Sequence, residues 1–594
     1  MSNPIFSTVK APSAKSSNFF MPHEVKSTTS IGRITPFYNP DIAPGDRVRV
    51  DADLYTKFLP MLAPILHRIN VYVHCFFVPY RLAWEPWKRF ITGSDDGFYS
   101  SDDEVSELPI LRCRNSGKNL YADWVTQDSS LLDYLNVGMS TVGGKSTSGL
   151  TLHINILPVL AFWRVWLDYY RDENLDDERT QKLIKMLDAF KPGINDLEQL
   201  MINTNLAWSD WGNYFFSCPF RAWDKDYFTG ALPFLQKGGS VSMPLNGSAP
   251  VFLDGSKTRE IQYFEDGTGT APSSGDTPLF IGQLGGNGIS AYDSAGVNPN
   301  NPDSIRVALN DNGEVMNQLY LNPNGTLYAD LSQGSALTIN ELRRANALQR
   351  WEELNARGGS RYIEQILSHF GVRSSDARLQ RAEYLGGSKI PVSISEVFNT
   401  NGVDDQISSL DSQQVLGGFA GHAQASASGF LFDRTFEEHG MIFCLMTVVP
   451  KAGYFQGADR IFLKRDRMEF IWPVMANLGE QPIYNEELFY AVNGIPADPA
   501  SSSETFGYTP RYAEYKYEPD RVHGLFRSSL EFWHMARHFS NQPQLNSQFI
   551  SLRGFDPGVF PVALDVYNGD VILNQILLRV HMRRKLPFYG TPTL

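Results

Sequence analysis

The stretch from Thr35 to Gly93 constrains the fold more than any other part of this chain. Residues Asp46 to Leu54 alternate charged and apolar side chains, which is the period-two pattern of a strand with one buried face. Residues Arg68 to Val78 then place apolar side chains at every second position, until Pro79 interrupts the hydrogen-bonding ladder. Two long strands so close in sequence predict a protein built on β-sheet.

Further strand patterns lie far along the chain. Met441 to Val449 is almost wholly apolar and predicts a buried strand, and Val571 to Arg583 alternates and predicts the last strand. We also expect a short strand at Ile461 to Lys464 and an aromatic strand region from Trp208 to Phe220. Strands spread over the whole chain predict non-local pairing, as in a jelly roll whose connections have been expanded.

Helical patterns interrupt these strands. Leu157 to Asp172 reads as a helix with Pro158 in its first turn, and Gln181 to Phe190 has apolar residues at helical spacing. Thr338 and Glu341 form a capping-box pattern before a helix that runs to Gly358. A second helix is expected to open at Ser360.

Composition agrees with a turn-rich β protein, because the chain of 594 residues contains 48 Gly, 35 Pro, 38 Phe and 26 Tyr. Cys75, Cys113, Cys218 and Cys444 are widely spaced, which predicts neither a disulfide framework nor a cysteine-based zinc site. No apolar run has the length of a signal peptide core or a membrane span. We therefore expect a protein that is neither exported nor inserted into a membrane.

The texture of the chain changes at residue 237. From there to 335, Gly, Ser, Asn, Pro and Asp dominate and apolar residues come only in short runs, which predicts an insertion. The expected organisation is an N-terminal arm at 1–34, the first part of the β fold with helical insertions at 35–236, a variable surface insertion at 237–335, and a helical insertion followed by the remaining strands and a C-terminal arm at 336–594.

Motifs for catalysis are weak. Glu531, His534 and His538 have the spacing of a partial metal-ligand set on one helical face, but di-iron bundles need a second such motif and zincins need a glutamate inside the histidine pair. Packing and hydrogen bonding explain these residues better. Phosphate loops and nucleophile elbows are absent from the sequence, so we predict no catalytic, cofactor-binding or metal-binding residues and no enzyme activity.

Five blocks of the sequence carry a resemblance. The region Thr35 to Gly93 with its PGD turn and WEPWKRF is similar to the N-terminal portion of the major capsid protein of microviruses, especially the gokushovirus-like group. Four later blocks agree in order: RSSDARLQRAEYLGGSKIPVSISEVFNT (373–400), FGYTPRYAEYKYEPDRVHGLFR (506–527), HFSNQPQLNSQFI (538–550) and MRRKLPFYGTPTL (582–594).

This resemblance implies a fold and an assembly. The fold would be mainly β, a single eight-stranded antiparallel jelly roll of the viral capsid type with long loop and helical insertions. Sixty copies, by way of pentamers, would form a T=1 icosahedral shell around a circular single-stranded DNA genome, assembled in the host bacterial cytoplasm and found in the virion. The insertion would form a threefold protrusion that meets a host cell-surface receptor, and a pilot or minor capsid protein would be a further partner.

Net charge limits how this chain meets nucleic acid. The formal charge of −13 argues against a surface that grips DNA everywhere, and so against a dedicated single-stranded DNA-binding module. Any genome contact must be local, and an acidic shell needs a separate cationic species, which we predict to be a small basic DNA-binding virion protein. The candidate DNA contacts are the basic residues near both ends of the chain: Arg579, Arg583, Arg584, Lys585, Lys10 and Lys15.

Aromatic residues mixed with cations suggest subunit contacts. They are also typical of single-stranded nucleic-acid platforms, although the subunit interface is the favoured interpretation. The candidates for the subunit interface are Trp84, Trp87, Tyr508, Tyr512, Tyr515, Tyr517 and Arg521. The alternative function is a carbohydrate-active β-sandwich enzyme, suggested only by aromatic content, acidity and turns; its two carboxylates need proximity in space rather than in sequence.

Overall fold

The computed structural model describes residues 16–92, 107–113, 128–137, 152–175, 178–237, 251–253, 261–264, 318–321, 327–329, 339–358, 368, 380–398, 419–490, 505–560 and 569–589. The chain divides into two compact units. We call 1–237 with 352–594 the sandwich unit and 238–351 the insertion unit. Helix α9 (Ile339–Gly358) confirms the helix expected before Gly358. The boundary between the two units falls inside this helix, after residue 351. The second helix expected after Ser360 lies outside the described residues, apart from residue 368.

One sheet of the sandwich unit joins the two ends of the chain. Its antiparallel order is β1–β20–β5–β16–β15, with β2 also pairing with β20. The strands are β1 (Ser17–Phe20), β2 (His23–Thr29), β5 (Arg47–Phe58), β15 (Ser393–Phe398), β16 (Phe419–Thr435) and β20 (Ile572–Arg584). β20 pairs with β5 from Ile572 opposite Phe58 to Arg583 opposite Arg47. The alternation of both strands and their non-local pairing are thus confirmed.

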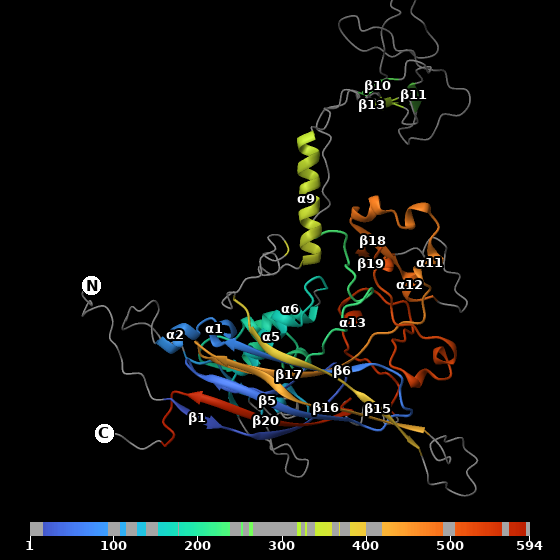
Figure 1. Ribbon diagram of the computed structural model, residues 1–594. Coiled ribbons are helices and arrows are strands. Elements are labelled where there is room, and N and C mark those ends of the chain that lie inside the picture. Colours follow the sequence, from blue (N-terminus) through green and yellow to red (C-terminus); the bar gives the residue numbers. More distant parts are fainter. Residues whose placement is uncertain are drawn as a thin grey trace, which may run out of the picture. The chain divides into compact units, whose positions relative to one another are not determined.

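A second antiparallel sheet faces the first. Its order is β14–β6–β17–β3, with β4 also pairing with β17. Its strands are β3 (Thr35–Tyr38), β4 (Asp41–Ile42), β6 (Ile69–Pro79), β14 (Glu383–Pro391) and β17 (Gly440–Pro450). Side chains from both sheets, such as Val50 of β5, Val73 of β6 and Val580 of β20, share one hydrophobic core. The chain is therefore mainly β, and its two facing antiparallel sheets agree with the predicted jelly roll (Figure 1).

The strands β6 and β17 are buried on both faces. Cys444 of β17 joins the core between the sheets, whereas its neighbour Phe443 joins a second core formed with helices. The ring of Phe162, on helix α5 (Leu157–Tyr169), lies 6.1 Å from that of Phe443 between ring centroids. Double burial explains why β17 reads as a continuous apolar run and β5 as an alternating one.

The helical layer corrects one prediction. Residues 208–220 were expected to be an aromatic strand region, but α8 (Trp208–Asp210) leads into a π-helical turn at Trp211–Phe215. Trp211 and Phe215 are four residues apart and both pack against Phe190, so their spacing suits a helical face rather than a pleated strand. The aromatic content of the segment was a misleading signal, because packing decides the state of such residues.

The remaining elements are short. The sandwich unit adds α1 (Tyr80–Ala83), α2 (Trp87–Thr92), α4 (Leu131–Tyr134), α6 (Glu178–Asp188), α7 (Leu197–Thr204), α12 (Asn485–Leu488), α13 (Ser547–Ile550), β7 (Ile110–Cys113), β8 (Leu152–Asn155), β9 (Ile194–Asp196), β18 (Glu480–Tyr484) and β19 (Thr505–Pro510). The insertion unit contains two hairpin-like pairs, β10 (Val251–Leu253) with β13 (Leu327–Ala329) and β11 (Ile261–Phe264) with β12 (Gln318–Leu321). Within the described ranges, the helices are all too short or too polar to cross a bilayer.

A second prediction is wrong at residues 461–464. The segment forms a helical turn, α11 (Arg460–Leu463), in place of the expected strand. Arg460 points inward and is buried, whereas the next two residues, Ile461 and Phe462, are both exposed. Consecutive exposed positions are incompatible with the alternation of a half-buried strand.

Two histidines in the sandwich unit are partly buried and uncharged at neutral pH. The ring of His67 donates from Nε2 to the carbonyl of Lys451 at 2.7 Å, and Nδ1 of His74 lies 2.8 Å from the hydroxyl of Tyr170. Burial lowers the pKa of each imidazole from 6.5 to about 4, because the charged form would lose its hydration.

This burial predicts a loss of stability in mild acid. Below pH 6.5 the unfolded chain binds protons that the folded chain accepts only near pH 4, so the free energy of unfolding should fall as the pH drops from about 6.5 to about 4. Urea unfolding of the isolated subunit across this range measures it. His67→Gln removes one titrating group but keeps an amide donor for Lys451, so its pH dependence should be shallower. An unchanged slope in that variant would contradict the assignment.

Candidate subunit and nucleic-acid interfaces

The basic cluster on β20 divides into paired and exposed cations. Arg579 is paired with Asp53 of β5, at 3.0 Å between Nη2 and Oδ1. The hydroxyl of Ser428 and this guanidinium hold the pKa of Asp53 below its usual value, against the effect of partial burial. Arg579 therefore carries its own counter-charge within the sheet.

Arg584 has a structural role. Its Nε donates to Asp46 Oδ2 at 2.8 Å, and its Nη2 donates to the carbonyl of Asp41 at 2.7 Å. The Asp46 side chain is almost wholly buried, so its charge depends on this partner. Arg584 thus ties the C-terminal strand to the turn that precedes β5.

Arg583 and Lys585 are the cations of the cluster that face solvent. Arg583 donates from Nε to the hydroxyl of Ser16 at 3.0 Å. In the part of the chain that the structure describes, no carboxylate forms an ion pair with either side chain. Among the candidate DNA contacts, these two side chains could pair with phosphate. Lys10 and Lys15 lie outside the described residues.

The tryptophan candidates lie in the helical layer of the sandwich unit. Trp84 is buried in the core formed with helices, which makes it a core residue of this chain. Trp87 is partly buried, with its ring 4.8 Å from Tyr80 and 5.9 Å from His439 between ring centroids. Only Trp87 retains surface for a neighbouring subunit.

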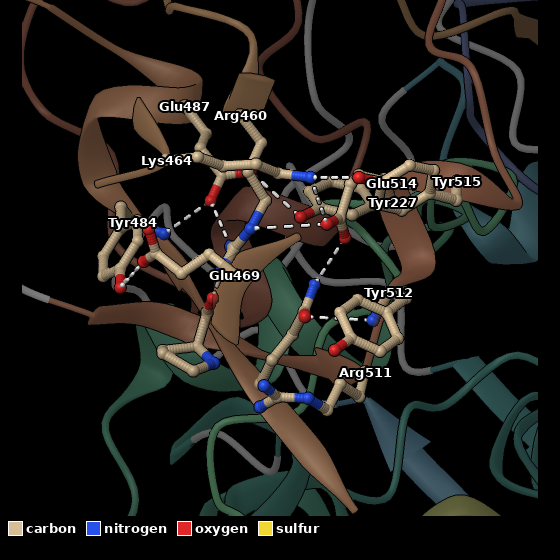
Figure 2. A network of polar contacts seen from close by, with 12 residues as sticks. Tyr227, Arg460, Lys464, Glu469, Tyr484, Glu487, Arg511, Tyr512, Glu514 and Tyr515 are labelled. Carbon is tan, nitrogen blue, oxygen red and sulfur yellow. Dashed lines mark hydrogen bonds and ion pairs between the residues drawn. The ribbon is translucent and has the colours of Figure 1, made fainter. Parts of the chain in front are cut away.

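Two of the tyrosine candidates, Tyr512 and Tyr515, contact a buried network of charged residues that the sequence did not reveal (Figure 2). Tyr508 lies in β19, Tyr517 is half-buried, and Tyr515 is exposed. Tyr512 is buried, and its backbone N–H donates to the side-chain carbonyl of Gln481 at 2.9 Å. Arg521 is exposed and forms a 2.9 Å ion pair with Asp459.

The centre of this network is an ion pair withdrawn from water. Arg460 Nη1 lies 2.7 Å from Glu487 Oε1, and the two side chains are only 8% and 3% exposed. The same Arg460 donates to the carbonyl of Pro482 at 2.7 Å, and Tyr227 donates its hydroxyl to Glu487 Oε2 at 2.9 Å. Burial raises the pKa of Glu487, while Arg460 opposes that shift.

A second ion pair extends the network towards the surface. Lys464 lies 3.2 Å from Glu514 Oε1, and its ammonium also contacts the hydroxyl of Tyr515 at 2.9 Å. Gln481 donates to the other Glu514 oxygen at 2.7 Å. Each charged group therefore has a hydrogen-bonded partner, which is the condition under which buried charges are tolerated.

The metal-like spacing of Glu531, His534 and His538 does not become a helical face. Glu531 begins a 3₁₀ turn, and the backbone is already extended at His534. Both ring nitrogens of His534 are occupied, by the carbonyl of Phe526 at 2.8 Å and the N–H of Ala536 at 3.1 Å. His538 instead approaches Glu531 at 2.5 Å. Over the described ranges, no three His, Cys, Asp or Glu side chains gather into a metal-ligand set.

Comparison with known proteins identifies this architecture. Residues 7–594 match the family described as capsid protein (F protein). The chain belongs to this capsid protein family.

Relatives match over nearly the full length of the chain. The capsid protein VP1 of Chlamydia phage 1 is 31% identical over 99% of this chain and 97% of its own length. The capsid protein VP1 of Bdellovibrio phage phiMH2K is 31% identical over 92% of this chain and 89% of its own length. The capsid protein VP1 of Spiroplasma virus 4 is 26% identical over 99% and 97%.

Family membership settles the class of function. The capsid protein is a structural component of a phage particle, and the carbohydrate-active alternative is not favoured. Self-assembly into a capsid and a place in the virion follow from the same membership. The functional sites to look for in this capsid protein are therefore contact surfaces rather than a catalytic cleft.

The buried network generates a prediction for the isolated subunit. Arg460→Met leaves Glu487 buried without its cation, so the free energy of unfolding should fall by about 3–5 kcal/mol. Arg521→Met removes a comparable pair that is 44% and 36% exposed, and should change stability by less than about 1 kcal/mol. Urea unfolding measures both. Equal losses in the two variants would show that burial of the Arg460 pair has no special weight.

Proposed function

We propose that this capsid protein forms a T=1 icosahedral shell of sixty copies, by way of pentamers, around a circular single-stranded DNA genome. The observation that carries the proposal is the full-length match to capsid proteins of small phages, together with a two-sheet sandwich as the main unit. Closed symmetry lets one surface of each subunit meet another surface of the next, so many weak contacts add up to a stable particle. Assembly takes place in the host bacterial cytoplasm, and a pilot or minor capsid protein is a further partner.

In this proposal the genome meets the shell at a local basic site. The net charge of −13 opposes general binding to phosphate, so the inner surface needs concentrated cations and a small basic virion protein that neutralises the remaining DNA charge. Arg583 and Lys585 are the best candidates near the C-terminus, because Arg579 and Arg584 are held by Asp53 and Asp46.

This division of the cluster leads to a packaging prediction. Arg583→Gln with Lys585→Gln should lower the DNA content per particle while shells still form, because two exposed phosphate partners are lost and no buried pair is broken. The ratio of DNA to protein in purified particles measures it. Arg584→Gln is the matched control, and should instead lower the yield of folded subunit, since Asp46 loses its cation. Unchanged packaging in the double variant would exclude these residues as genome contacts.

The insertion unit is proposed to act in host attachment, as a protrusion from the shell that meets a cell-surface receptor. Support comes from its compact character and from the way it leaves the sandwich unit. The backbone N–H of Lys237 lies 3.5 Å from the carbonyl oxygen of Glu352, so the chain departs and returns at one place. Such an insertion can vary without rearranging the core.

Deletion of residues 238–351, with a short Gly-Ser linker between Lys237 and Glu352, tests the whole proposal. Shells should still assemble, because both junction residues already lie side by side, but adsorption of the phage to its host should be lost. Electron microscopy measures assembly, and binding of particles to host cells measures adsorption. Normal adsorption by the deleted particle would refute the attachment role. Absence of shells from the full-length protein would refute the assembly itself.

A further inference from the structure

One segment of the sandwich unit exposes far more apolar surface than its neighbours. From α11 to the start of β18, seven apolar side chains are at least half exposed: Ile461, Phe462, Phe470, Ile471, Trp472, Val474 and Leu478. Val474 is 88% exposed and Phe462 82%. We call residues 461–478 the apolar ledge. Soluble proteins rarely leave such side chains together in water without a partner for them.

The ledge is rigid rather than a loose loop. The side chain of Glu469 accepts the backbone N–H of Asp466 at 3.1 Å and closes a capping box. Arg511 donates to the carbonyl of Met468 at 2.8 Å, and the indole of Trp472 donates to the carbonyl of Arg467 at 2.9 Å. The backbone of the ledge is thus fixed while its apolar side chains point away from the sandwich core.

The buried network of Figure 2 supports the ledge from below. Arg460 and Lys464, on either side of Phe462, are held by Glu487 and Glu514. The backbone N–H of Trp472 donates to the hydroxyl of the buried Tyr512 at 3.3 Å. A surface ordered in advance loses little conformational entropy on contact, and this is the property that makes an apolar patch effective in binding.

The size of the ledge suits a specific protein contact. With large apolar side chains presenting roughly 150–250 Å² when fully exposed, these fractions correspond to surface on the order of 700 Å². This total approaches the roughly 800 Å² that each partner buries in a standard interface. The exposed Arg465, Asp466 and Arg467 supply charges of both signs between the apolar residues, as in the polar part of an interface.

We propose that the apolar ledge is a contact between subunits, covered in the particle by a second copy of this chain. The proposal rests on the proposed assembly, since a shell of identical subunits must bury such a surface repeatedly on each copy. Phe462 and Val474 are expected to contribute most to the contact, because they are the most exposed of these apolar side chains and lose the most contact with water when covered.

Phe462→Asp with Val474→Asp tests this contact in the full-length chain. The isolated subunit should unfold at the same temperature as the wild type, because both side chains are already in water. The yield of particles should fall by about tenfold or more, because each contact would bury two unpaired carboxylates. Ile202→Asp on α7 is the matched control, because Ile202 is 71% exposed and lies outside the ledge. This variant should assemble like the wild type. Hydrogen exchange should slow at 461–478 on passing from subunit to particle.

The outcomes separate this proposal from the proposed function. Wild-type particle yield from the double aspartate variant would overturn the ledge contact and leave the shell intact. A clear loss of subunit stability in that variant would also overturn it, by showing that a segment of the same chain covers the ledge. Failure of the unaltered chain to form any shell would refute the proposed function itself.

Discussion

The double burial of β6 and β17 is the constraint on which the rest of the sandwich unit depends. These strands pair along their length, with Ile69 opposite Pro450 and Pro79 opposite Gly440. One of their faces closes the core against β5 and β20, and the other carries the helical layer around α5. Every residue of β17 is buried, so nearly all of its side chains are apolar, and the one hydroxyl, of Thr447, accepts a hydrogen bond from Arg221 Nη1 at 3.5 Å. The six-stranded sheet packs against the core on one face only, so its other face can carry charged side chains.

That freedom explains how an acidic chain arranges its cations. On the outward face of the six-stranded sheet, arginines pair with aspartates across neighbouring strands, as Arg47 does with Asp433 at 2.8 Å. Such exposed pairs contribute little stability, but each places a carboxylate beside a cation. What remains available to a polyanion is set by geometry rather than by the number of basic residues. Arg584 is paired with Asp46 and is partly buried, whereas Arg583 and Lys585 are exposed.

Buried polar contacts and exposed apolar side chains are coupled in the region of α11, β18 and β19. The ion pair of Arg460 and Glu487 holds the backbone from within, while Phe462 and Val474 face water. This arrangement reverses the usual distribution of polar and apolar groups, and it suits a subunit that completes its surface only on assembly. The buried ion pair thus stabilises the single chain, whereas the exposed apolar side chains are left for contact with a neighbour.

The sequence by itself determined the class of this protein and the positions of β5, β6, β17 and β20, because alternation and apolar runs are local records of burial. It did not predict β16, the longest strand, whose small and polar residues give no such run. It determined the family as well, since Thr35 to Gly93 and the later blocks stand in the family's order. It misassigned residues 208–215 and 461–464, where aromatic and branched side chains suit strands equally well on propensity alone. Only the tertiary structure decided which cations are neutralised, that Trp84 and Tyr512 are core residues, and that Phe462 faces solvent. Those properties depend on partners hundreds of residues away, such as Asp46 for Arg584, and no local pattern encodes such distances.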